Sequence, residues 1–341
     1  MKTTMKTTTL LVLAGALVAG SSCAQVTPSA FTEACESAAS QATAANVAGA
    51  DPDWLFLKSE LAHLGIGAFA GEPAATEAAK EIASYNQQLK DLGVRLVFVP
   101  VPAKAAIYPE KFLDGATAAD VAPNKPFLDK LAAEGVEVID LEPVFRAARA
   151  SGDGGRKVYC AQDAHWSPYG AELAAAEIAK VLGGAPELAG VPKIPSLKVG
   201  AVEDLQIKGD LAFGGFAGMA RETVTLRRAG TGEGDQIARL DEDPSSPLLL
   251  LGDSHLEVFT VGGAEMHTTA AGLRDHLQAE LGFAMDRVNN RNSGADSARA
   301  NLVRRAKREA DFWETKKVVV WCFSIREITQ GKWRPIPAQM P

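Results

Sequence analysis

The sequence contains no repeat of fixed period, and this absence excludes solenoid and propeller folds. It also lacks an excess of basic residues. The 341 residues include 35 Lys and Arg against 42 Asp and Glu, for a net charge of -7, which argues against a nucleic-acid binder. Hydrophobic residues make up 47% and charged residues 23%, so the chain has the composition of a globular protein rather than a disordered one.

Long apolar runs are absent as well. The run Leu10–Gly20 has 11 residues, whereas a membrane-spanning helix needs about 20. Lys2 and Lys6 precede this run, and a basic start followed by a short apolar run is typical of a secretory signal peptide. We therefore predict that residues 1–24 are a signal peptide and that the protein is exported to the periplasm.

The cleavage site is predicted after Ala24, because Ser22 and Ala24 fit the rule of small residues at such sites. Lipidation at Cys23 is the alternative, and it is less favoured because Gly20 stands where an aliphatic residue is usual. Removal of Lys2 and Lys6 changes the net charge from -7 to -9.

Cysteines are few, and three remain when Cys23 is set aside. An odd number in an oxidising compartment predicts one disulfide and one free thiol. Cys322 lies within the apolar run 318–323 and is expected to pack as a small hydrophobic side chain. This leaves a predicted disulfide between Cys35 and Cys160, and the alternative is that all three thiols are free.

Short apolar runs alternate with helical patterns from residue 51 onwards. Strands are expected near residues 94–100, 136–140, 248–251, 284–288 and 318–323, and helices near 74–92, 171–182, 270–281 and 296–312. This alternation predicts an α/β fold with a parallel sheet covered on both faces, whose functional site lies beyond the carboxyl ends of the strands. Residues 25–50 are expected to be a partly helical lead-in segment, and residues 51–341 one domain.

The strand predicted at 248–251 leads directly into Gly252, Asp253 and Ser254. A glycine at the end of a strand permits a tight turn, which presents the following serine at the rim of the sheet. The arrangement has the physical logic of a nucleophile elbow, although the Gly-x-Ser-x-Gly pattern is absent. A simple turn is the alternative.

Residues 163–170 form a second candidate constellation. An aspartate and a histidine two residues apart, Asp163 and His165, can be arranged so that the carboxylate fixes the tautomer of the imidazole. Ser167 and Pro168 are expected to cap and start the next helix. A helix-capping loop is the alternative, and no second ligand cluster accompanies the motif, so we predict no metal site.

The other four histidines offer weaker signals. His255 adjoins Ser254, but neighbouring side chains diverge, so it is expected to shape the rim of the pocket. His63, His267 and His276 are interpreted as surface or structural residues.

Together these motifs resemble the SGNH-type domain of alginate O-acetyltransferases of the AlgX and AlgJ type. Further segments share the resemblance, and they are Trp54–Leu57, Val99–Lys104, Tyr108–Pro109 and Gly209–Leu211. The resemblance spans about residues 51–330, and the order of its motifs is specific, since the Asp and His precede the Ser. It implies a three-layer, flavodoxin-like SGNH fold and a triad of Ser254, His165 and Asp163.

The resemblance also implies an activity. Ser254 would form an acyl-enzyme and pass an acetyl group to a hydroxyl of an exopolysaccharide, with no cofactor, and a membrane-bound O-acyltransferase would supply the acetyl groups. A carbohydrate esterase with the same triad and a non-catalytic polysaccharide-binding or scaffold protein are the alternatives. The chain ends soon after the last predicted strand, so no carbohydrate-binding module is expected after the catalytic domain.

An oxyanion hole needs backbone N–H groups or an amide side chain beside the serine. The Ser254 N–H is one expected donor, and the second is expected to be the Gly294 N–H, with Asn292 as the alternative. Asn and Gly also favour an ordinary polar turn here.

Aromatic and basic residues near these motifs are the candidates for substrate contacts. Trp166 and Tyr169 could stack on sugar rings, although Trp166 could equally belong to the core. Arg299 belongs to a helix whose basic side chains could hold uronate carboxylates, and a solvated helix face is the alternative.

Overall fold

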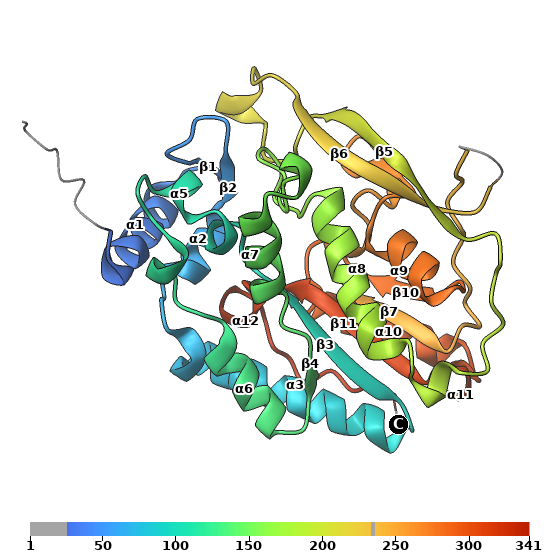
Figure 1. The fold of residues 1–341 in the computed structure, drawn as a ribbon. Helices are drawn as coiled ribbons and strands as arrows, with labels where there is room; N and C mark the ends of the chain where they lie inside the picture. The colour runs from blue at the N-terminus through green and yellow to red at the C-terminus, as the bar shows by residue number, and fades with distance from the viewer. Residues whose placement is uncertain (1–25, 233–235, 341) are drawn as a thin grey trace, which may run out of the picture.

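Five parallel strands form the central sheet, in the order β10-β7-β11-β3-β4 (Figure 1). The structure is a computed structural model that describes residues 26–232 and 236–340. The strands are β3 (Arg95–Val101), β4 (Glu137–Val138), β7 (Leu248–Gly252), β10 (Asp286–Asn289) and β11 (Val318–Ser324). All five strands predicted for the sheet are therefore present, and β10 pairs with β7 at one edge.

The apolar runs form the middle of the sheet because both of its faces are covered. Every residue of β7 and β11 is buried. Strands buried on both faces are continuously hydrophobic, as parallel sheets require. β11 pairs with β3 on one side and β7 on the other, so the last strand of the sheet occupies its centre.

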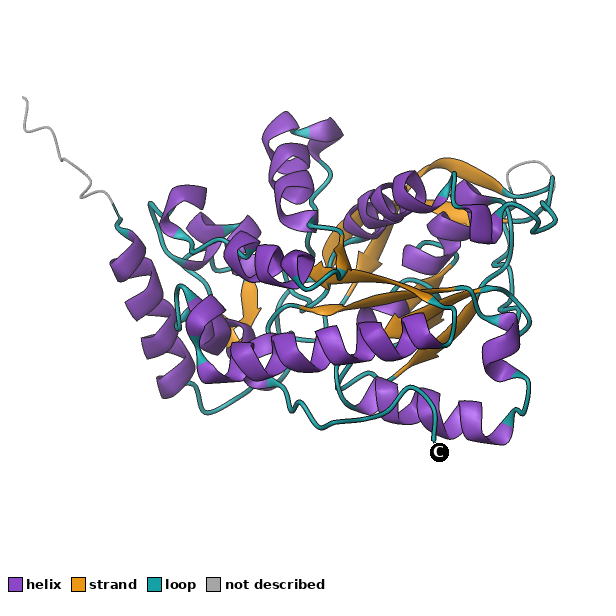
Figure 2. Ribbon diagram, turned by 90° about the horizontal axis from the view of Figure 1, so that it is seen from below, coloured by secondary structure: helices purple, strands orange, loops and turns teal. Residues whose placement is uncertain are grey.

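Helices cover both faces of the sheet, which gives three layers (Figure 2). One face carries α3 (Pro73–Asp91) and α10 (Ser297–Arg308), and the other carries α7 (Leu141–Ser151), α8 (Pro168–Leu182) and α9 (Leu273–Leu281). The remaining helices are α1 (Pro28–Gln41), α2 (Lys58–Leu64), α4 (Lys104–Ile107), α5 (Pro109–Phe112), α6 (Lys125–Ala133), α11 (Phe312–Thr315) and α12 (Glu327–Gln330).

Local sequence determines where α8 begins. The Ser167 hydroxyl accepts a hydrogen bond from the Gly170 N–H at 3.2 Å, and Pro168 is the first helical residue. A serine cap followed by proline is the favoured start of a helix, and both were expected here. The loop before α8 is therefore attached to a firmly positioned helix.

In the part of the chain that the structure describes, three antiparallel strand pairs lie outside the central sheet. They are β1 (Asn46–Ala48) with β2 (Leu55–Leu57), β5 (Lys198–Ile207) with β6 (Glu222–Gly230), and β8 (Val261–Gly263) with β9 (His267–Thr269). None was predicted from the sequence, and the second and third form walls of the candidate site.

The lead-in segment contains α1 and β1, in keeping with the prediction that it is partly helical. α1 packs on α2, and its buried side chains include Cys35 and Phe31, whose ring meets that of Phe112 in α5 edge-on. The predicted signal peptide and the Cys23 lipid site lie outside the described residues. None of the helices in residues 26–232 and 236–340 combines the length and apolarity needed to cross a membrane.

The predicted disulfide between Cys35 and Cys160 is wrong, because Cys35, Cys160 and Cys322 are all free and buried. Cys35 faces the core from α1, and burial raises the pKa of its thiol. The Cys160 thiol instead donates to the Trp166 carbonyl oxygen at 3.8 Å. Each thiol thus packs as a small hydrophobic group.

Candidate active site

Ser254 lies at the carboxyl end of β7, where the chain makes a tight turn into a short 3-10 helix, Ser254–Leu256. A Cβ atom at Gly252 would lie 1.9 Å from the carbonyl oxygen of Cys322, so the neighbouring strand leaves room for glycine alone. The N–H of Ser254 opens the 3-10 turn, where helical geometry leaves N–H groups without an internal partner. The sheet thus presents the serine at its rim, as the sequence predicted.

Asp163, His165 and Ser254 form one hydrogen-bonded chain. The His165 Nδ1 is 2.7 Å from Asp163 Oδ1, and its Nε2 is 2.7 Å from Ser254 Oγ. Since an ionised carboxylate only accepts, Nδ1 carries a proton, and in the neutral imidazole Nε2 is then able to accept from the serine hydroxyl. The structure brings together the three side chains predicted to act jointly.

The loop that carries Asp163 and His165 is fixed by two buried charged side chains. Glu222 on β6 accepts the N–H groups of Ala161 at 2.7 Å and Gln162 at 2.9 Å. The Lys104 ammonium donates to three carbonyl oxygens. Two of them belong to this loop, those of Ala161 and Asp163, each at 2.9 Å. The third is the carbonyl oxygen of Leu55.

Both carboxylate oxygens of Asp163 are engaged. Oδ1 accepts from the backbone and ring of His165, whereas Oδ2 accepts from the Asp210 N–H and from His267 Nε2, each at 2.9 Å. His267 was interpreted from the sequence as surface or structural, and that interpretation missed its contact with Asp163. No local pattern marks it, because 104 residues separate it from Asp163.

Charge sets the protonation of this cluster. Burial disfavours an imidazolium at His165, but the Asp163 carboxylate outweighs burial and raises the His165 pKa to about 9. His165 and His267 in turn hold the Asp163 pKa well below its usual range despite burial. Burial and the charge of Asp163 raise the pKa of Asp210 to about 6.

His255 was expected at the rim of the pocket, but it is buried behind His165. Its Nδ1 lies 2.8 Å from Asp253 Oδ1, and its ring stands edge-on between His165 and Trp166. Burial lowers the pKa of His255. Asp253 also accepts the Ser324 N–H at 2.9 Å, which ties the turn after β7 to the end of β11.

The predicted second oxyanion donor, the Gly294 N–H, is already engaged. It donates to Glu327 Oε1 at 2.9 Å, and the Glu327 carboxylate also accepts from Ser293 and Ala295. A Cβ atom at Gly294 would lie 2.3 Å from the Phe323 Cβ atom, so the glycine serves close packing beside β11. Asn292, the alternative, is exposed and lines the same cleft as Ser254.

The three predicted substrate contacts are structural instead. Trp166 is fully buried against Phe145, and the Arg156 guanidinium covers the Tyr169 ring at 3.9 Å. Arg299 is 1% exposed, and its guanidinium lies 5.4–5.6 Å from three aromatic ring centroids, those of Tyr85, Trp321 and Trp333. All three side chains are buried and none of them lines the cleft above Ser254, so the structure gives them packing roles.

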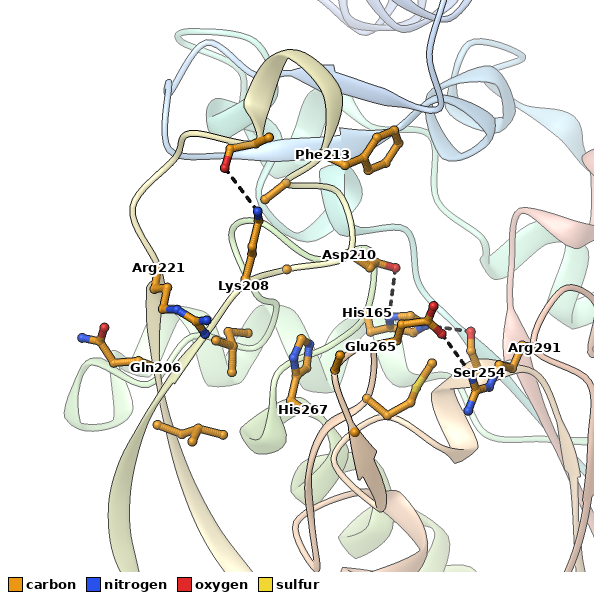
Figure 3. A pocket seen from close by; sticks show the side chains of 18 of the residues that line it. His165, Gln206, Lys208, Asp210, Phe213, Arg221, Ser254, Glu265, His267 and Arg291 are labelled. Atoms are coloured by element: carbon orange, nitrogen blue, oxygen red, sulfur yellow. Dashed lines mark hydrogen bonds and ion pairs between the residues drawn. The ribbon is translucent and has the colours of Figure 1, made fainter.

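A cleft of about 740 Å³ opens above Ser254 and His165 (Figure 3). The β5–β6 hairpin and the segment joining its strands supply Lys208, Phe213 and Arg221, and the β8–β9 hairpin supplies Glu265 and His267. Both hairpins therefore face the serine across the cleft.

Arg291 stands at the mouth of the cleft. It pairs with Glu265 at 3.0 Å and also with Glu257. Lys208, Arg221 and Arg291 are exposed, so the cleft carries cationic side chains that solvent and solutes can reach.

Asp163, His165 and Asp210 each place a potential metal-ligating atom within 4.8 Å of the others. Both ring nitrogens of His165 are already in hydrogen bonds, and both oxygens of Asp163 accept donors. These contacts suit a proton-transfer chain, in which each nitrogen has a defined role, better than a set of metal ligands.

A family model described as the SGNH hydrolase-like domain of acetyltransferase AlgX matches residues 47–325. The chain belongs to this family. The AlgX-family match covers every strand of the central sheet and all the residues of the candidate triad.

Individual relatives agree with this assignment. The chain is 36% identical over 110 residues to a probable alginate O-acetylase AlgJ of Pseudomonas fluorescens, covering 32% of this chain and 27% of that protein. It is 25% identical over 244 residues to the alginate biosynthesis protein AlgX of Pseudomonas putida, covering 68% and 49%. The chain thus spans about a quarter to a half of the length of these curated relatives.

The O-acetyltransferase domain of Pseudomonas putida AlgJ has a similar solved structure, with a TM-score of 0.61 and 23% identity. The similarity covers 83% of this chain and 92% of that domain. The predicted SGNH-like α/β fold is therefore confirmed.

Proposed function

We propose that the protein is an exported O-acetyltransferase that places acetyl groups on hydroxyls of a uronate-containing exopolysaccharide. The observation that carries the proposal is the Asp163–His165–Ser254 hydrogen-bonded chain at the base of an open cleft. Membership in the AlgX family supports acetyl transfer as the chemistry.

In the first half-reaction, Ser254 Oγ attacks the acetyl carbonyl of the donor while His165 Nε2 takes the serine proton. The resulting imidazolium is stabilised by Asp163, in keeping with the raised His165 pKa. The tetrahedral intermediate then collapses as the bond to the leaving group breaks, and the leaving group takes the proton from His165. An acetyl ester on Ser254 remains.

In the second half-reaction, a sugar hydroxyl gives its proton to His165 and its oxygen attacks the acetyl carbonyl. Ser254 leaves and regains the proton, which restores the resting site. In both steps the negative oxygen needs donors, and the Ser254 N–H and the Asn292 side-chain amide are proposed for this role.

Cations in the cleft support a polyanionic acceptor. The net charge of the chain is negative, which disfavours general capture of a polyanion. Lys208 and Arg221 nevertheless line the cleft, where they are positioned to pair with uronate carboxylates, whereas Arg291 is paired with Glu257 and Glu265.

Export and the acetyl donor complete the proposal. The basic start and apolar run within residues 1–24 support a signal peptide and a periplasmic location. An acceptor site outside the cytoplasm needs acetyl groups delivered across the membrane, so a membrane-bound O-acyltransferase is the proposed partner.

Hydrolysis is the second candidate, because a cleft open to solvent also admits water to the acyl-enzyme. The two are separated by supplying purified protein with p-nitrophenyl acetate and oligouronates, then examining the sugars by mass spectrometry. Acetylated sugar that disappears in Ser254→Ala supports transfer. Acetate release without acetylated sugar across several acceptors would support the esterase.

A further inference from the structure

His267 approaches the candidate triad from a separate part of the chain. It is the first residue of β9, and its Nε2 lies 2.9 Å from Asp163 Oδ2 on the side opposite His165. Its side chain is 3% exposed, although the residue lines the cleft (Figure 3). The Asp163 carboxylate is thus held between two imidazoles.

The hydrogen-bond pattern assigns opposite tautomers to the two rings. Because the carboxylate only accepts, His267 must carry its proton on Nε2, whereas His165 carries its proton on Nδ1. Asp163 Oδ1 then accepts hydrogen bonds from His165 alone, and Oδ2 accepts them from His267 and the Asp210 N–H. Rotation of the carboxylate would break contacts on both sides.

The backbone holds His267 in place against local preference. Its φ angle is 63°, in the left-handed region that a non-glycine residue rarely occupies. Such conformations persist where the surroundings enforce them, and they cluster at functional sites. The ring rests on Phe259 at 5.1 Å between centroids, and the Phe259 N–H donates to the carbonyl oxygen of Met266.

The charged groups around this ring have other partners. Glu265 on the same hairpin pairs with Arg291, and Arg228 from β6 donates to Thr268 and Thr269. Asp210 accepts the Ala164 N–H. Asp163 is therefore the acidic group that the His267 ring engages directly.

We propose that His267 is a positioning residue, whose Nε2–H donor fixes the Asp163 carboxylate so that Oδ1 stays aligned with His165. This inference rests on the proposed function of the triad and adds a fourth side chain to it. Loss of the donor leaves Oδ2 with the Asp210 N–H as its one remaining donor, which weakens the restraint that keeps the carboxylate from turning away from His165. The predicted effect is on the acylation rate rather than on binding of a small ester.

The test compares two amides of different reach. In His267→Gln the amide nitrogen takes the place of Nε2, whereas in His267→Asn it falls one bond short. With p-nitrophenyl acetate, we expect Asn to lower kcat by about 10- to 100-fold, the range for loss of a hydrogen bond to a charged group. We expect Gln to stay within a few-fold of the wild type, and KM to change little in either variant.

His267→Phe separates the N–H from the ring. It keeps packing on Phe259 but removes the donor, so it should resemble Asn. Equal activity in the Gln and Asn variants, or wild-type activity in the Phe variant, would overturn the inference. His63→Asn is the control, since His63 is also buried on a phenylalanine ring, with its Nδ1 2.8 Å from Thr329 Oγ1, but lies outside the cleft.

A second measurement does not depend on turnover. The His165 imidazole can be titrated by NMR in the Ser254→Ala background, with and without each His267 substitution. The Asn and Phe substitutions should shift the His165 titration, and Gln should not, and identical titrations in all of them would overturn the inference. Full activity of Ser254→Ala itself would instead reject the proposed function, so the two failures are distinguishable.

Discussion

His165 and His255 stand edge-on with ring centroids 4.9 Å apart, and each receives the same local support. In both cases an aspartate two residues earlier accepts the histidine N–H and its Nδ1 through one carboxylate oxygen. The outcomes differ, since the pKa of His165 is raised and that of His255 is lowered. Of the two rings, only that of His165 contacts Ser254 through its Nε2. The hydrogen bond to the serine, and not the Asp-x-His pattern, therefore distinguishes the two histidines.

Substitution of the triad should remove activity. Ser254→Ala and His165→Ala should each lower acetate release from p-nitrophenyl acetate roughly a thousandfold or more, and the double substitution should add little, because such residues act as a unit. Asp163→Asn should be comparable or milder, since it disturbs the tautomer while leaving the base in place. His255→Asn serves as the comparison, and a loss there as large as in His165→Ala would contradict the assignment of His165 as the base.

Activity should rise with pH, and the midpoint should lie above the ordinary imidazole pKa of 6.5, towards about 9. The reason is that only neutral His165 can take the serine proton, and Asp163 stabilises its charged form. The measurement is kcat/KM from pH 5 to 9.5, corrected for spontaneous hydrolysis. A midpoint at or below 6.5 would contradict the strong coupling of His165 to Asp163.

The same raised pKa affects stability. A group whose pKa is higher in the folded state stabilises that state fully below its unfolded pKa, and this contribution is lost as the pH rises through the folded value. The contribution of His165 should therefore be present below about pH 6.5 and decline up to about pH 9. Urea unfolding of the wild type and His165→Gln across this range measures it, and parallel curves would contradict it.

Lys104→Met should destabilise the fold by about 2–4 kcal/mol, because it removes a buried donor from three carbonyl oxygens, of which that of Ala161 keeps the Leu55 N–H. The free energy of unfolding is measured with urea. Lys90→Met is the matched control, since Lys90 donates to one carbonyl oxygen, that of Gly135, at an exposed position. Similar changes in the two variants would show that the buried ammonium is not important for folding.

Arg221→Gln should raise the KM for oligouronate acceptors several-fold and leave acetate release from the small ester unchanged. Arg221 lines the cleft but is not part of the hydrogen-bonded chain, so it can affect the acceptor without affecting acylation. A neutral oligosaccharide provides the control acceptor. An equal effect on both acceptors would argue against a carboxylate contact.

The sequence allowed prediction of those parts of the site that depend on neighbouring residues. A wholly apolar strand ending in Gly252 and a Ser167–Pro168 helix start are local signals, and both elements form as expected. His267 and Glu327 could not be found this way, because hairpins and turns distant in sequence bring them to Asp163 and Gly294. The prediction that Arg299 contacts the substrate was wrong. The sequence shows that the helix is basic, but it does not show which of its side chains aromatic rings enclose.

The position of β11 has a consequence for the order of folding. Residues 318–324 lie between β3 and β7, so synthesis delivers the middle strand of the sheet last. Until then β3 and β7 lack their shared neighbour, and the turn that carries Ser254 lacks the Ser324 N–H that holds Asp253. The sheet therefore cannot close around its middle strand, nor can the turn that carries Ser254 be held by Ser324, until residues 318–324 have been synthesised.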